Sequence, residues 1–144
     1  MNSRRNAFTL VELVVVIMIL GILAAVAAPK LLNTSKVATD NGLRQTLSIV
    51  RDAIELYAAE NGGNLPPCAD ATSSFQDAVK DYIRGTFPKS PVGTQDKNVT
   101  ATTTDPVVAD ATPANSWKYN TVTGEFIINS AALSGDGITA YEAF

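Results

Sequence analysis

Residues Ala7 to Pro29 read AFTLVELVVVIMILGILAAVAAP and are apolar or uncharged throughout, apart from one acid, Glu12. From Phe8 to Ala28 the run is long enough, at about 1.5 Å per helical residue, to cross a hydrocarbon core of roughly 30 Å. A carboxylate inside such a span costs on the order of 3 kcal/mol on insertion scales. We therefore expect a transmembrane helix in which Glu12 has a function.

The composition of the chain argues against two classes of function, nucleic-acid binding and enzymatic catalysis. The chain has 144 residues, 11 Lys and Arg, 14 Asp and Glu, and a net charge of −3, which becomes −5 without residues 1–7 because Arg4 and Arg5 leave with them. The negative charge of such a chain disfavours binding to nucleic acid, whose phosphates are also negative. The chain has no histidine, and we find no phosphate loop, zinc-ligand spacing or paired-carboxylate motif, so we expect no enzymatic activity. Beyond the span, the length allows one small domain.

Two residues interrupt the apolar run. Gly21 in its middle and Pro29 at its end both weaken the helical hydrogen-bond ladder, so we expect flexibility there. Beyond Pro29, apolar residues recur at alternating spacings of four and three, which predicts an amphipathic stem helix over residues 30–61. The stripe that we expect to face the core comprises Leu43, Leu47, Val50, Ile54 and Tyr57. Asn61-Gly62-Gly63 is a typical helix end.

The remainder, residues 62–144, is predicted to form a small globular head. A short helix is expected to follow an N-cap at Ser74 and to end near Gly85. Residues 88–115 lack periodicity and predict a long surface loop, with room for an edge strand around Val107 and Val108. Residues 117–128 predict a β-hairpin that turns at 121–124 and has Trp117 and Phe126 in the core. Cys68 has no cysteine partner for an intramolecular disulfide, and we expect it to be inert.

The position of Glu12 suggests how the span could be used. If a peptidase cut between Ala7 and Phe8, the new amine of Phe8 would lie four residues from Glu12, on the same helical face. In lipid, the carboxylate of one chain can meet the amine of another when helices pack side by side. Glu12 would then set the register of a polymer.

At these residues the chain resembles the type IV pilins and type II secretion pseudopilins. The matching features are the short basic leader, the junction Ala7-Phe8, the core FTLVEL with Glu12, the segment GILAAVAAP through Pro29 and the amphipathic stem. The segments YAAENGGNLP, YIRGTFPKSP and WKYNTVTGEFIIN look like those of major pseudopilins of the G type.

The resemblance implies an α+β, pilin-like fold: a long N-terminal helix, half transmembrane and half amphipathic, packed on a head with a short helix and an antiparallel hairpin or sheet. It implies a leader of residues 1–7, a transmembrane and assembly helix of residues 8–29, cleavage by a prepilin peptidase and N-methylation of Phe8. The expected product is a homo-oligomeric helical filament, drawn from membrane lipid by an inner-membrane assembly platform. Before assembly the N-terminus would be cytoplasmic, and the head and the filament would be periplasmic or extracellular.

Two features depart from the family pattern. Ala7 stands where the family nearly always has glycine, which puts the efficiency of cleavage in question. Pseudopilins of the G type commonly bind calcium in an acidic C-terminal loop, but here that region offers only Asp136 and Glu142, fewer ligands than calcium needs. We expect no cofactor and retain only a weak calcium candidate at Asp136.

Four other interpretations stay open at this point. Glu12 could remain protonated in a plain anchor, or residues 1–28 could be a secretory signal with Ala25-Val26-Ala27 as its cleavage motif. Within the family, the chain could be a type IV pilus pilin, major or minor. Outside it, the chain could be a membrane-anchored adhesion or binding domain that uses residues 88–115.

Overall fold

The structure is a computed structural model that describes residues 9–69 and 73–144. It contains two α-helices, α1 (Leu10–Glu60) and α2 (Ser74–Val79), two short 3-10 helices, η1 (Lys80–Tyr82) and η2 (Tyr141–Ala143), and three strands, β1 (Val99–Thr102), β2 (Trp117–Asn120) and β3 (Phe126–Ile128). The expected α+β, pilin-like fold class is confirmed. The chain divides into one unit up to Lys36 and a second, the head unit, from Val37 to Phe144.

In the first unit α1 remains helical through Pro29. Proline has no amide hydrogen, so the carbonyl of Ala25 lacks its usual donor four residues later. One turn further on, the Thr34 hydroxyl donates to the carbonyl of Lys30 at 2.9 Å, which does not replace the bond that Pro29 removes. The proline therefore marks a weak point in the helix and not its end.

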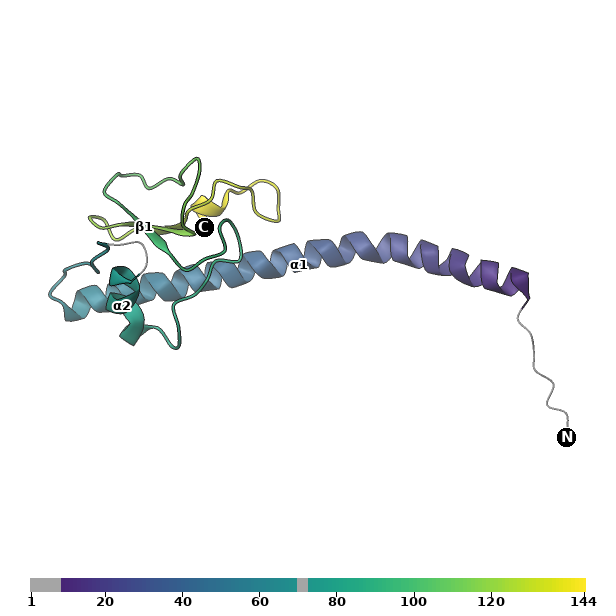
Figure 1. Ribbon diagram of the computed structural model, residues 1–144, viewed down its shortest axis with the longest axis horizontal. Helices are drawn as coiled ribbons and strands as arrows, with labels where there is room; N and C mark the ends of the chain where they lie inside the picture. Colours follow the sequence, from purple (N-terminus) through teal and green to yellow (C-terminus); the bar gives the residue numbers. More distant parts are fainter. Residues whose placement is uncertain (1–8, 70–72) are drawn as a thin grey trace, which may run out of the picture. The chain divides into compact units, whose positions relative to one another are not determined.

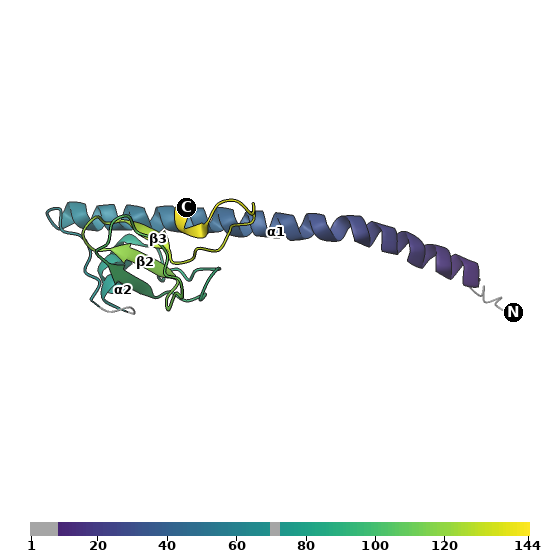
Figure 2. The same cartoon turned by 90° about the horizontal axis from the view of Figure 1, so that it is seen from above.

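In the head unit, residues 37–60 of α1 present one buried face. Leu43, Leu47, Val50 and Ile54 are at most 3% exposed and Tyr57 is half-buried, so the predicted stripe is confirmed. In Figures 1 and 2 the strands and α2 lie alongside this part of α1. The periodic apolar face of α1 thus becomes one wall of the head's core.

The predicted hairpin is also confirmed. Strands β2 and β3 pair antiparallel with Tyr119 opposite Phe126, and Trp117 and Phe126 are fully buried. Their rings are 5.4 Å apart, and Phe75 of α2 stacks on Phe126 at 5.7 Å. Aromatic stacking between the sheet and α2 therefore fills the centre of the core.

The third strand differs from the expectation. It is β1, and it lies at Val99–Thr102 rather than at Val107 and Val108; it pairs parallel with β2, so the sheet is mixed and not purely antiparallel. Val99 is buried and two threonines favour an extended backbone. Pro106 directly precedes Val107 and cannot donate to a ladder, which disfavours a strand there.

The short helix also begins differently. Ser73 holds the N-cap position, and Ser74 is the first helical residue, whose hydroxyl accepts a hydrogen bond from the amide of Ala69 at 2.9 Å. The helix tightens into η1 before Gly85, which has a positive φ of 93°. The predicted cap at Ser74 was therefore wrong by one residue.

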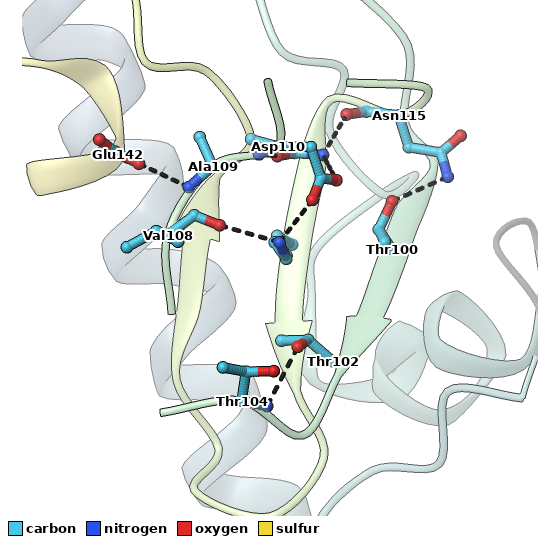
Figure 3. A network of polar contacts seen from close by, with 10 residues as sticks. Thr100, Thr102, Thr104, Val108, Ala109, Asp110, Asn115 and Glu142 are labelled. Atoms are coloured by element: carbon cyan, nitrogen blue, oxygen red, sulfur yellow. Dashed lines mark hydrogen bonds and ion pairs between the residues drawn. The ribbon is translucent and has the colours of Figure 1, made fainter. Parts of the chain in front are cut away.

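The loop between β1 and β2 is held by polar contacts (Figure 3). The Nζ of Lys118 in β2 donates to the carbonyl of Val108 at 2.8 Å and forms an ion pair with Asp110 at 2.6 Å. Asn129 donates to the other carboxylate oxygen of Asp110, and Glu142 accepts from the amide of Ala109. These contacts fix residues 108–110 against the hairpin and the C-terminal segment.

Candidate assembly site

Glu12 lies in the first turn of α1, and its side chain is exposed. The turn is capped by Thr9, because the Thr9 hydroxyl accepts a hydrogen bond from the amide of Glu12 at 3.2 Å. Threonine followed three residues later by glutamate is the sequence pattern of a capping box. Our reading of the sequence missed Thr9, although this pattern was the signal for it.

The helix around Glu12 has an apolar surface on every side. The large hydrophobic side chains between Leu10 and Leu31 are 44–78% exposed. None of the most apolar stretch of α1 is buried, and within the described residues α1 alone is long and apolar enough to cross a membrane. A helix that is apolar all round is suited to lipid or to packing against other helices.

No cation of the described chain pairs with Glu12. The ion pair between Lys118 and Asp110 is the single one found over residues 9–69 and 73–144. Ala7 and Phe8, the predicted cleavage and methylation site, lie outside the described residues. The pairing of Glu12 with an amine therefore stays a prediction.

The two predicted points of flexibility lie within α1. A Cβ added to Gly21 would meet nothing within 4 Å, so glycine is not required there by packing in the described chain. Pro29 interrupts the hydrogen-bond ladder without ending the helix. Their role in flexibility remains a prediction.

Asp136, the calcium candidate, has an environment that does not fit a cation. Its carboxylate accepts hydrogen bonds from the amides of Ile138 and Thr139 and from the hydroxyls of Ser134 and Thr139. The amide hydrogen bonds, followed by those of the hydroxyls, hold its pKa well below its ordinary range. Among the described residues, no three His, Cys, Asp or Glu side chains gather as a metal-binding group.

Comparison with known proteins adds independent evidence. Residues 2–28 match the family model described as the prokaryotic N-terminal methylation motif. The type II secretion system core protein G of Aeromonas hydrophila is 29% identical over 104 residues, which cover 64% of this chain and 71% of that protein.

Two further relatives match over shorter stretches. The prepilin peptidase-dependent protein D of Escherichia coli is 42% identical over 61 residues, and the type IV narrow pilus major component PilA5 of Thermus thermophilus is 35% identical over 65 residues. These matches cover 42% and 45% of this chain, and they span 42% and 55% of the two relatives. No solved structure gives a significant match.

The methylation motif, the named relatives and the long apolar helix with its small α+β head agree. Together they support the type IV pilin and pseudopilin family, whose members are structural subunits and not enzymes.

Proposed function

We propose that this chain is a structural subunit of a pilus-like filament, and that within the family it is the major pseudopilin of a type II secretion system. One observation carries the proposal: an exposed carboxylate, Glu12, lies in the first turn of a helix whose surface is otherwise apolar. It lies four residues after Phe8, the mature N-terminus that we propose.

The chemistry of assembly follows from this position. Cleavage after Ala7 would create an ammonium group on Phe8, and Glu12 of one subunit would pair with the ammonium group of its neighbour. In a medium of low dielectric this attraction is much stronger than in water, and a charge left in lipid without its partner would be costly. Since each subunit has one such amine and one such acid, the pair would fix the axial register of the filament.

The cellular arrangement is part of the proposal. A prepilin peptidase would remove residues 1–7 on the cytoplasmic side, where Arg4 and Arg5 hold the N-terminus. The apolar part of α1 would anchor the subunit in the inner membrane until an assembly platform extracts it. The head would then form the filament surface, and the apolar helices would form its interior.

The length of one match favours a pseudopilin. The 104-residue alignment with core protein G is longer than α1 and everything before it, so it includes part of the head. The match to the Thermus thermophilus pilus component supports a pilin as the second candidate. Deleting the gene distinguishes the two candidates. Loss of protein export indicates a pseudopilin, and loss of surface pili indicates a pilin.

The test of the assembly role is the change Glu12→Ala. We expect normal membrane insertion, because the span becomes more apolar, and a loss of filaments, because the amine of the neighbouring subunit has no partner. Filament yield is measured by electron microscopy and shearing, and insertion by membrane fractionation. The matched control is Asp52→Asn, which removes an exposed acid of α1 from the head unit.

Glu12→Gln refines the test, since it keeps the size and removes the charge. Filaments at wild-type yield in both Glu12 variants, with normal insertion, would disprove the assembly role. A membrane-anchored binding domain predicts a different result: no filaments even from the unchanged chain, because its span never leaves the bilayer and the chain stays a monomer.

A further inference from the structure

The C-terminal segment Ser130–Phe144, which we call the clasp, is fastened to α1 at Asp40. Asp40 is 8% exposed, and both of its carboxylate oxygens accept hydrogen bonds from the clasp. The amide of Gly135 donates to one oxygen at 2.8 Å, and the hydroxyl of Tyr141 donates to the other at 3.1 Å. The buried carboxylate of Asp40 thus binds two residues that lie 95 and 101 positions further along the chain.

Two arginines of α1 hold the end of the clasp. The guanidinium carbon of Arg44 lies 3.5 Å from the ring centroid of Phe144, a cation–π contact. Arg51 donates through Nη1 to the backbone oxygen of Phe144 at 3.1 Å, and through Nε and Nη2 to the carbonyl of Phe126. Asp40, Arg44 and Arg51 are spaced by four and seven residues, which places them along one side of the helix.

The turn inside the clasp is closed by Asp136. Its Oδ1 accepts from Ser134 Oγ and the amide of Ile138, each at 2.7 Å, and from the amide of Thr139 at 2.9 Å; its Oδ2 accepts from the hydroxyl of Thr139 at 2.9 Å. These four donors direct their hydrogens at the carboxylate. A calcium ion instead needs six to eight oxygen ligands directed at itself.

Glu142, the other acid of the clasp, is also engaged elsewhere. Its Oε2 accepts from the amide of Ala109, in the loop that the Lys118 contacts hold. Neither acid of the clasp therefore presents a free set of oxygens to a metal. The donor set conflicts with the calcium site that the resemblance to pseudopilins implies.

We propose that the clasp is a metal-independent closure of the head: Asp136 shapes its turn, and Asp40, Arg44 and Arg51 fasten it to α1, in the role that the family gives to calcium. The clasp contacts depend on side chains of α1 outside the assembly site. The proposal is therefore independent of whether the chain forms filaments.

The test is thermal unfolding of the full chain in detergent micelles, followed by the near-ultraviolet circular dichroism of the head's aromatic core. We expect the same Tm in millimolar calcium chloride and in excess EGTA. Asp40→Asn and Tyr141→Phe should each lower the Tm, by roughly 5–10 °C for the buried aspartate. The decrease should be equal in the two buffers.

Amide hydrogen exchange distinguishes loss of the clasp from general destabilisation. Asp40→Asn should speed exchange at Gly135 far more than in the core strands β2 and β3, whereas the control Asp52→Asn, whose side chain is exposed on α1, should not. A Tm that rises with calcium in the wild type but not in Asp136→Asn would overturn the proposal. So would an unchanged rate at Gly135 in Asp40→Asn.

Discussion

At the scale of single residues, two glycines show opposite requirements. Gly124 ends the turn of the β2–β3 hairpin with φ at +80°, and a Cβ there would lie 3.0 Å from a methyl group of Leu65. Gly42 lies inside α1, and a Cβ there would meet nothing within 4 Å. The first position therefore requires glycine for its backbone conformation, and the second does not.

The two positions make a matched prediction. Gly124→Ala should lower the free energy of unfolding of the head by about 1–2 kcal/mol, because an L-residue is strained at this φ. Gly42→Ala should raise it by about 0.5–1 kcal/mol, because alanine restricts the unfolded chain and favours helix. Urea unfolding of the full chain in detergent measures both; two changes of the same sign would contradict the backbone argument.

At the scale of elements, the surface of α1 changes character along the helix. Up to Leu31 its large apolar side chains are exposed, and from Leu43 it has one buried stripe. Pro29 lies near the end of the exposed region, where the backbone has lost a hydrogen bond. We expect this weak point to loosen when a subunit enters a filament.

Pro29→Ala tests that role. The substitution restores the amide donor to the carbonyl of Ala25, so hydrogen exchange of the neighbouring amides should slow while filament yield falls. Exchange is measured by mass spectrometry in micelles, with Gly42→Ala as a control in the same helix. Slower exchange combined with full filament yield would show that a flexible Pro29 is not needed for assembly.

At the scale of the whole molecule, carboxylates hold the head together. Hydrogen bonding from Lys118, followed by that from Asn129, lowers the pKa of Asp110, and amide donors lower that of Asp136. Burial alone would raise the pKa of Asp96, but hydrogen bonds from Thr94, Asn98 and Ser116 hold it below its ordinary value. Each aspartate is thus a stronger acid in the folded chain than in the unfolded one.

The sign of the pH dependence follows from these shifts. A carboxyl group whose pKa is lowered by folding stabilises the fold fully above its unfolded pKa, near 4, and loses that contribution as the pH falls further. We expect the Tm of the head to be constant from pH 7 to about pH 5 and to fall below pH 4. Asp110→Asn should flatten part of this fall, and a Tm that rises on acidification would contradict the assignment.

The sequence was most informative where periodicity or fixed spacing applied. The stripe from Leu43 to Tyr57 and the pairing of Trp117 with the Phe126 strand followed from periods of 3.6 and 2. Strand β1 could not be placed in this way. Its four residues pair in parallel with β2, and each partner lies eighteen positions further along the chain, as Val99 and Trp117 do. The Asp40 and Arg51 contacts were beyond prediction for the same reason, since their partners lie 75 to 101 residues away.

The proposed role of Glu12 in assembly requires that cleavage of the leader creates a free amine on Phe8, one helical turn before Glu12. The most direct measurement is the intact mass of the chain purified from membranes of cells that contain a prepilin peptidase. The account predicts a chain that starts at Phe8 and carries one added methyl group. A chain that still begins at Met1, or one cut near Ala28, would contradict it.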